Sequence, residues 1–246
     1  MKKRPTMSPN DELKLRQAII DGCIEMNAAG YNQGMSGNVS ARFGDRLLIT
    51  PGSIAYDRLR ADMIVPMAIS DGSWSGAYEP SSEWRFHRDI LAARSDVNAV
   101  VHLHSPFATA LSMARKPIPA CHYLIASFGG DDVRCADYAV NGSQALSDAA
   151  LAALEDRTAC LLANHGMITV GGTLAAALDA AVQLEALARQ YCIALSIGGP
   201  VLLTRQEVEA SPAYQMQKVH PQGSGRDAGP SRFAMTGFPE SAKCND

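Results

Sequence analysis

Apolar residues recur every three or four positions in two long stretches of this chain. The first follows Ser8-Pro9-Asn10-Asp11, a helix-start sequence with a capping serine and an early proline, and continues to about residue 30. The second covers residues 173–196 and carries leucine and alanine along one stripe. Shorter patterns of the same kind predict helices at residues 82–94, 106–113 and 142–154.

Short apolar runs between these stretches predict strands. They lie at residues 39–43, 46–50, 63–66, 98–104, 159–163 and 167–170, whereas residues 123–126 form either a strand or an irregular segment. Several successive runs are joined by turns too short to contain a crossover helix, which favours antiparallel pairing. We therefore predict an α/β fold, a three-layer α/β/α sandwich around a mixed, mostly antiparallel sheet.

The C-terminal part of the chain loses this periodicity. From about Gly198 onward the sequence becomes rich in proline, glycine and serine. We expect a single domain over residues 8–200, with flexible tails at residues 1–7 and 218–246.

Composition and charge narrow the choice of partners. The chain has 246 residues, 47% of them hydrophobic, and a net charge of −3, so nothing indicates binding to nucleic acid or to an anionic membrane. No apolar run is long enough to span a bilayer, and no apolar stretch follows the basic N-terminus, so we expect a cytoplasmic protein. The six scattered cysteines include no C-x-x-C pair, which argues against disulfides and against a cysteine zinc site.

Two histidines separated by one residue are the strongest chemical signal. Side chains alternate along a strand, so His102 and His104 point to one face of the sheet while Leu103 points to the other. Two adjacent imidazoles suit a divalent metal ion better than a hydrophobic core, where both would need hydrogen-bond partners. His165, at the end of another apolar run, is a third ligand candidate. These residues predict a metal site.

Three short segments have donors suited to a phosphate group. Ser81-Ser82 stands at a predicted helix start, Gly37-Asn38 lies in a glycine-rich turn, and Gly52-Ser53 follows Thr50-Pro51. Each segment also has a simpler interpretation, because a serine can act only as a helix cap and a glycine segment can be an ordinary turn.

Three further polar residues have two interpretations each. Beside a metal, Glu83 could be a ligand, a general base, or each in turn; otherwise it is a surface carboxylate favoured by the helix dipole. His87, one turn later, is expected to support the site or to pack rather than to bind the metal. Tyr123 either belongs to a buried polar pair with His122 or supplies a phenol where a proton is exchanged.

Several segments together resemble the class II aldolase/adducin superfamily. The similarity runs in fixed order from about residue 11 to residue 197 and is greatest to the L-fuculose-1-phosphate aldolases of that superfamily. The segments that carry it are Asn32-Gln33-Gly34, Ser36-Gly37-Asn38-Val39-Ser40, Pro80-Ser81-Ser82-Glu83-Trp84-Arg85-Phe86-His87, Asn98-Ala99-Val100-Val101-His102-Leu103-His104, Ile118-Pro119-Ala120-Cys121-His122-Tyr123 and Asn164-His165-Gly166.

The resemblance implies a metal site, a phosphate site and an assembly. It implies Zn²⁺ bound by His102, His104 and His165, although Co²⁺ or Mn²⁺ could occupy such a site. Glu83 would be the fourth ligand in the resting state. A C4-symmetric homotetramer is also implied, in which Tyr123 enters each active site from the neighbouring chain. The implied phosphate-binding residues are Gly37, Asn38, Gly52, Ser53, Ser81 and Ser82.

The implied activity is reversible aldol cleavage of a ketose 1-phosphate to dihydroxyacetone phosphate and an aldehyde. In that reaction Tyr123 would take the proton of the C4 hydroxyl, and Glu83 would protonate the enediolate at C3. The metal ion would stabilise the enediolate as a Lewis acid. The alternatives are a metal-dependent decarboxylase or epimerase of the same superfamily and, third, a non-catalytic interaction module.

The chain departs from the superfamily pattern mainly where the aldehyde half of the substrate would lie. Met35 replaces a threonine, Asn141 replaces an aromatic residue, and the order of Gly52-Ser53 is unusual. Tyr214 is the one candidate for a further C-terminal aromatic residue. We therefore expect a changed aldehyde, and the candidate substrates are L-fuculose 1-phosphate and a 5-deoxy- or 5-methylthio-ribulose 1-phosphate.

Overall fold

A seven-stranded sheet forms the centre of the molecule. The computed structural model describes residues 8–219, and the strand order is β3-β2-β1-β4-β7-β6-β5. All neighbouring strands are antiparallel except β5 with β6, so the predicted mixed, mostly antiparallel sheet is confirmed. The strands are β1 (Asn38–Phe43), β2 (Arg46–Ile49), β3 (Val65–Ala68), β4 (Ala99–Leu103), β5 (Arg134–Ala136), β6 (Ala159–Leu162) and β7 (Gly166–Gly171).

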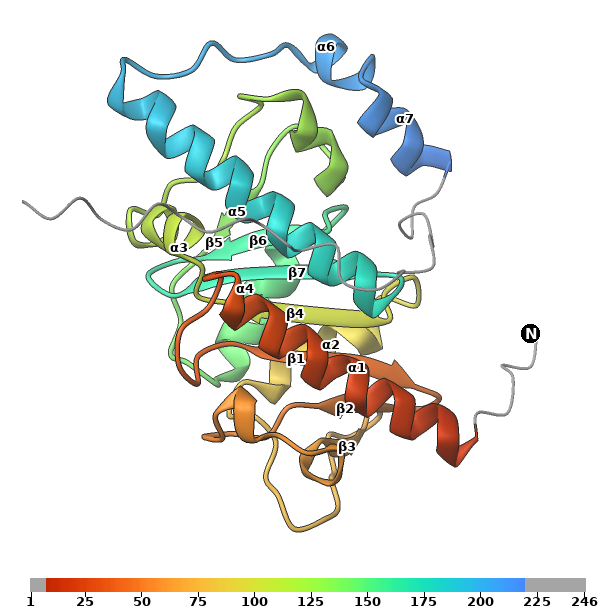
Figure 1. The fold of residues 1–246 in the computed structure, drawn as a ribbon. Helices are drawn as coiled ribbons and strands as arrows, with labels where there is room; N and C mark the ends of the chain where they lie inside the picture. The colour runs from red at the N-terminus through yellow and green to blue at the C-terminus, as the bar shows by residue number, and fades with distance from the viewer. Residues whose placement is uncertain (1–7, 220–246) are drawn as a thin grey trace, which may run out of the picture.

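Helices cover both faces of this sheet, which gives the predicted three layers (Figure 1). One face carries α1 (Pro9–Ala28), α3 (Pro106–Met113) and α5 (Leu174–Ser196), and the other carries α2 (Trp84–Ala93) and α4 (Gln144–Ala153). None of the helices within residues 8–219 is both long and apolar enough to cross a membrane. The remaining elements are η1 (Tyr56–Arg58), η2 (Ala61–Met63), η3 (Tyr123–Phe128), α6 (Arg205–Glu209) and α7 (Pro212–Val219).

Because side chains alternate between the two faces of the sheet, the apolar residues form two cores, one under each helical layer. Val39 and Val101 lie in the core beneath α1 and α5, whereas Val100 lies in the core beneath α2 and α4. All three are 0% exposed, and full burial of such a side chain contributes about 1.5–3 kcal/mol. Because a one-residue slip would exchange the two faces, this burial also fixes the face on which His102 lies.

The two long helices begin where the sequence predicts. Ser8 caps α1 by accepting a hydrogen bond from the Asp11 N–H, and the Asp11 carboxylate accepts one from the Ser8 N–H in return. Thr173 caps α5 by accepting a hydrogen bond from the Ala176 N–H. Caps of this kind contribute about 1 kcal/mol each.

Several local boundaries differ from the prediction. The helix expected at residues 82–94 begins at Trp84, with Glu83 at the capping position. The strand expected at residues 63–66 is Val65–Ala68, because Ala61–Met63 forms a 3₁₀ turn. Residues 123–126 belong to the 3₁₀ helix η3. Strand β5 was not predicted, since three residues are too few to show alternation.

The chain after Gly198 is more regular than expected. Helix α6 begins with a capping box between Thr204 and Glu207, a local signal that does not depend on apolar periodicity. Both α6 and α7 pack against η3, so the packed part of the chain extends beyond residue 200. Of the predicted tails, residues 218–219 belong to the end of α7, and residues 1–7 and 220–246 lie outside the described residues.

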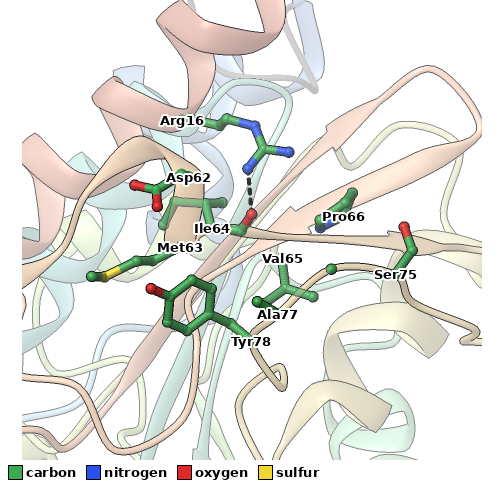
Figure 2. A pocket seen from close by; sticks show the side chains of 10 residues that line it. Arg16, Asp62, Met63, Ile64, Val65, Pro66, Ser75, Ala77 and Tyr78 are labelled. Carbon is green, nitrogen blue, oxygen red and sulfur yellow. Dashed lines mark hydrogen bonds between the residues drawn. The ribbon is translucent and has the colours of Figure 1, made fainter.

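A pocket of about 230 Å³ lies at the edge of the sheet beside β3 (Figure 2). Arg16 of α1 reaches over it and donates hydrogen bonds to the carbonyl oxygens of Ala61, at 2.9 Å, and Ile64. Asp62 and Tyr78 also line the pocket, but none of the predicted site residues does. The pocket is therefore separate from the histidine cluster.

Candidate metal centre and active site

The three predicted histidine ligands meet at one end of the sheet. His102 lies on β4 and His104 follows the end of that strand, whereas His165 lies in the turn between β6 and β7. The two Nε2 atoms of His102 and His104 are 3.0 Å apart, and one nitrogen from each of the three rings lies within 4.8 Å of the others. Three imidazole nitrogens this close can share one divalent ion.

Hydrogen bonding and burial prepare these rings to bind a metal. The Nδ1–H of His102 donates to the carbonyl oxygen of Met167 at 2.9 Å, which leaves the Nε2 lone pair directed at the cluster. Burial lowers the pKa of His102 to about 4 and also lowers the pKa of His104. Both rings are therefore neutral at neutral pH, which is the form that binds a cation.

Glu83 turns its carboxylate into the same cluster. It is 5% exposed, with Oε2 at 3.3 Å from His102 Nε2 and Oε1 at 3.2 Å from His165 Nε2. Burial raises the pKa of Glu83, but its electrostatic interactions with the nearby rings of His102 and His165 and a hydrogen bond from Asn38 lower the pKa by more. The net effect is that the pKa of Glu83 lies well below the ordinary value for a glutamate side chain.

The donor set fits a metal ion. Oε1 of Glu83 is buried and accepts no hydrogen bond from the described part of the chain. Its nearest polar neighbour is His165 Nε2, at 3.2 Å, and a buried carboxylate oxygen without a hydrogen bond is costly, by roughly 1–3 kcal/mol. A cation held by the three histidines would satisfy this oxygen, and nitrogen plus carboxylate oxygen is a donor combination typical of zinc sites.

A buried row of hydrogen bonds orients Glu83. Asn38 Nδ2 donates to Glu83 Oε2 at 2.8 Å, and Asn38 Oδ1 lies 2.5 Å from His87 Nε2. The other ring nitrogen of His87, Nδ1, lies 2.8 Å from the hydroxyl of Ser40. With the hydroxyl donating to Nδ1 and the Nε2–H donating to Asn38, the amide can present only its NH₂ group to Glu83. His87 thus has the supporting role that the sequence predicts.

The side chain of Asn38 contacts Glu83 and His87 in this structure, and its predicted role as a phosphate donor stays a prediction. The pairing of β1 with β4 sets Asn38 opposite His102. That register turns the amide toward α2, where its nitrogen donates one hydrogen bond to Glu83 and its oxygen accepts one from His87. Long-range strand pairing, which no local pattern reveals, therefore decides the role of this residue.

Two residues outside the predicted site hold the backbone of the histidines. Asn32 Oδ1 accepts a hydrogen bond from the backbone N–H of His104 at 3.2 Å. Ser112 Oγ accepts one from the backbone N–H of His165 at 3.3 Å. Asn32 belongs to a segment that carries the family resemblance, which is a usable signal, whereas nothing in the local sequence distinguishes Ser112.

The three predicted phosphate-binding segments lie next to one another. The backbone N–H of Thr50 donates to the Val39 carbonyl at 3.1 Å, and the Thr50 carbonyl accepts from the Ser81 N–H at 3.0 Å. Through these two bonds Thr50 connects Val39, which follows the first segment, with Ser81, which begins the third. The three segments therefore lie side by side, next to Glu83. The segments are Gly37-Asn38, Gly52-Ser53 and Ser81-Ser82.

Some of their polar groups already have partners. The Gly52 N–H donates to the Glu79 carbonyl at 3.2 Å, and Ser81 Oγ accepts from the Glu83 N–H at 3.3 Å. Ser53 and Ser82 are exposed, so their hydroxyls are the accessible donors at this place.

Comparison with known proteins decides the family. Residues 17–192 match the family described as Class II Aldolase and Adducin N-terminal domain. The chain belongs to this family. It is 50% identical over 201 residues to the 5-methylthioribulose-1-phosphate/5-deoxyribulose-1-phosphate aldolase of Rhodospirillum rubrum, which covers 82% of this chain and 90% of the relative.

Two further relatives agree with this assignment. The L-fuculose phosphate aldolase of Shigella flexneri is 44% identical over 196 residues, covering 79% of this chain and 91% of the relative. A solved structure of L-fuculose 1-phosphate aldolase superposes with a TM-score of 0.80 at 34% identity, covering 86% of this chain and 98% of that chain. Family and relatives confirm the expected enzyme class, an aldehyde-lyase.

Tyr123, the second predicted catalytic residue of this class II aldolase, lies away from the cluster in its own chain. It is 52% exposed on η3, and its ring lies beside that of His122. Within residues 8–219, no hydrogen bond or ring contact joins it to Glu83 or to the three histidines.

The residues that depart from the superfamily pattern lie near the surface. Met35 is 56% exposed and Asn141 is exposed in the loop after β5. That loop approaches the phosphate segments, because a Cβ added to Gly142 would lie 2.7 Å from the Ser82 carbonyl oxygen. Tyr214 lies in α7 and packs against the core beneath α5.

Proposed function

We propose that this chain is a zinc-dependent aldolase that reversibly cleaves a ketose 1-phosphate to dihydroxyacetone phosphate and an aldehyde. The observation that carries the proposal is the cluster of three imidazoles beside the buried, ionised carboxylate of Glu83. The adjoining segments with the exposed hydroxyls of Ser53 and Ser82 supply a place for the phosphate. Relatives named as aldolases of such sugar phosphates support the same reaction.

The preferred substrate we propose is 5-methylthio- or 5-deoxy-ribulose 1-phosphate, with L-fuculose 1-phosphate as the second candidate. The Rhodospirillum rubrum relative, at 50% identity, bears the name of the first activity. Asn141, in a loop near Ser82, stands where an aromatic side chain is expected for the fuculose aldolases. A changed side chain at this position suits a changed aldehyde.

The chain's own residues account for the proton transfers. A divalent cation bound by the histidines would supply Lewis-acid stabilisation of the negative charge on the dihydroxyacetone phosphate fragment. Tyr123 takes the proton of the C4 hydroxyl as the C3–C4 bond breaks and its electron pair passes to C3. Glu83, after taking up a proton from solvent as it leaves its resting contacts, delivers that proton to C3, and Tyr123 releases the C4-hydroxyl proton to solvent. In the synthetic direction Glu83 removes the proton from C3. Movement of Glu83 away from His102 and Asn38 removes the contacts that hold its pKa low, which suits this acid role.

The assembly that completes the site is a homotetramer in which Tyr123 comes from the neighbouring chain. The exposure of Tyr123 on η3, away from its own Glu83, supports a shared site. We further propose a cytoplasmic location and small sugar phosphates as the sole ligands besides the metal, with no nucleic acid or membrane partner.

A retro-aldol screen tests the function. Protein purified without chelators is incubated with a panel of ketose 1-phosphates, and dihydroxyacetone phosphate is measured with a coupled dehydrogenase. We expect release from 5-methylthio- or 5-deoxy-ribulose 1-phosphate, loss of activity after dialysis against EDTA, and recovery with Zn²⁺. Activity undiminished by EDTA would contradict the metal-dependent reaction. Carbon dioxide release or epimer formation, without cleavage of any member of the panel, would instead favour the decarboxylase or epimerase.

A further inference from the structure

Glu185 is a buried acidic residue that the proposed chemistry does not use. It lies in the middle of α5, a helix otherwise rich in alanine and leucine, and is 5% exposed. The apolar stripe that predicts this helix gives no role to Glu185. A carboxyl group buried at such a position needs hydrogen-bond partners to offset its lost hydration.

Within residues 8–219, its hydrogen-bond partners lie at the start of α3. Glu185 Oε2 accepts from the Ser105 hydroxyl at 2.7 Å and from the Ala108 N–H at 2.9 Å. Glu185 Oε1 accepts from the Phe107 N–H at 2.8 Å. Ser105 occupies the capping position of α3, but its own side chain makes no capping hydrogen bond. Glu185 therefore caps α3 from another helix, at the positive end of the α3 dipole.

This capped turn directly continues the metal-binding strand. Ser105 follows His104, and the backbone N–H of His104 donates to Asn32 Oδ1 at 3.2 Å. Asn32 thus holds the backbone of His104, and Glu185 holds the turn that follows it through the Ser105 hydroxyl and two backbone N–H groups. The Ser105 hydroxyl also lies 3.7 Å from the sulfur of Met167, the residue whose carbonyl oxygen orients His102.

We propose that Glu185 is a positioning residue for the metal centre. By fixing the turn from β4 into α3, it makes His104 present its ring to the point where the other two histidines meet. This inference rests on the proposed metal-dependent function. Strand β4 stays paired with β1 and β7 without Glu185, so the defect expected on its loss is in metal binding before folding.

The test compares Glu185→Gln with Thr173→Ala. The second variant removes the cap of α5 and contacts no histidine, so it is a control for the general loss of a helix cap. The dissociation constant for Zn²⁺ is measured by competition with a chelating dye, and the visible spectrum of Co²⁺-loaded protein reports the ligand geometry.

We expect Glu185→Gln to weaken zinc binding about 10-fold, as supporting residues around metal ligands do, and to alter the Co²⁺ spectrum. Thr173→Ala should lower the Tm by about 2–4 °C and leave zinc affinity and spectrum unchanged. Wild-type affinity and spectrum in folded Glu185→Gln would overturn the proposal.

A milder variant keeps the test decisive if Glu185→Gln does not fold. Ser105→Ala removes one of the three donors to Glu185 and retains both backbone donors. It should weaken zinc binding by roughly threefold, a fraction of the full effect; an unchanged dissociation constant would then refute the positioning role. A wild-type chain that binds no zinc would overturn the proposed function and this inference together. Tight zinc binding by the wild type and by both folded variants would overturn this inference alone.

Discussion

At the scale of single residues, the candidate site combines neutral imidazoles with one ionised carboxylate. Burial keeps the pKa of His102 near 4, so this ring does not repel a cation at neutral pH. Burial also lowers the pKa of His87 to about 3, which keeps its Nδ1 able to accept from Ser40 and its Nε2–H able to donate to Asn38. The charge available for binding a metal or moving a proton is therefore that of Glu83.

Replacing Glu83 by glutamine should abolish proton transfer and spare substrate binding. The amide keeps the shape of the side chain but cannot take up a proton, so we expect kcat to fall by about 10²–10⁴-fold with little change in KM. Exchange of the C3 proton of dihydroxyacetone phosphate in D₂O, followed by NMR, measures the lost step directly. Glu207→Gln, an exposed carboxylate in α6, is the matched control. Exchange at the wild-type rate in Glu83→Gln would remove Glu83 as the base.

Replacing Ser82 by aspartate should act on substrate binding alone. Ser82 is exposed beside the other phosphate segments, so a carboxylate there would repel the phosphate group. We expect KM to rise at least about tenfold while kcat changes little. Ser82→Ala removes the hydroxyl without adding charge and should have a smaller effect. Equal KM values for Ser82→Asp and the wild type would show that the phosphate binds elsewhere.

The roles of single residues could be predicted where they depend on residues close together in the sequence. The spacing of His102 and His104 on a strand suffices to predict that both rings face one way. Asn38 and Glu185 were not predictable in their roles, because each depends on a partner about 45 and 80 residues away along the chain. Tertiary pairing, rather than local spacing, assigns such polar residues their partners.

At the scale of elements, the site is built where β4 meets β7. Gly166 begins β7 immediately after His165, and Leu103 is paired with Met167 beside it. A Cβ added to Gly166 would lie 2.5 Å from the Leu103 carbonyl oxygen and 2.9 Å from the His104 ring. The absence of a side chain at this position therefore allows two histidine-bearing backbones to approach each other.

Replacing Gly166 by alanine should separate the histidine-bearing strands. Overpacking of this kind costs about 1–3 kcal/mol, which corresponds to a fall in Tm of roughly 2–12 °C in a domain of this size. Zinc content after purification should fall as well. Gly44→Ala, at the opposite end of β1, meets no atom within 4 Å of the new Cβ and tests backbone strain alone, since its φ is +65°. Wild-type Tm and zinc content in Gly166→Ala would contradict this account.

Elements with strong local signals were predictable and weak ones were not. Helices α1 and α5 combine long apolar stripes with Ser8 and Thr173 as caps, and both begin as expected. Strand β5 has three residues and gives no periodic signal. Helix α6 has five residues and is stabilised by the Thr204 capping box and by packing against η3. Neither feature produces a periodic apolar pattern in the sequence.

At the scale of the whole molecule, the three-layer arrangement follows from the short connections, whereas the strand order does not. Neighbours in sequence such as β1 and β2 pair directly, but β4 inserts between β1 and β7. This long-range insertion brings His102 next to Asn38 and near His165. In the proposed tetramer a second chain completes the site, which accords with the lack of contact between Tyr123 and the cluster of its own chain.

Mixing two inactive variants tests whether sites are shared between chains. We expect Glu83→Gln and Tyr123→Phe each to lose most activity alone. When they are co-expressed as mixed tetramers, about a quarter of the shared sites should contain both native residues and recover activity. Assays of mixed assemblies, with sedimentation to establish their size, measure this recovery. Activity no greater than that of the separate variants would indicate that each site belongs to one chain.

The loop after β5 has a consequence for how this enzyme can diverge. Tyr138, Val140 and Asn141 are all exposed, and neither hydrophobic core includes them. Mutations there should carry little thermodynamic penalty, so under the proposed function selection can change which aldehydes are accepted while the metal-binding histidines stay intact. A new substrate range could then evolve through substitutions at a few exposed positions, without an intermediate variant that fails to fold.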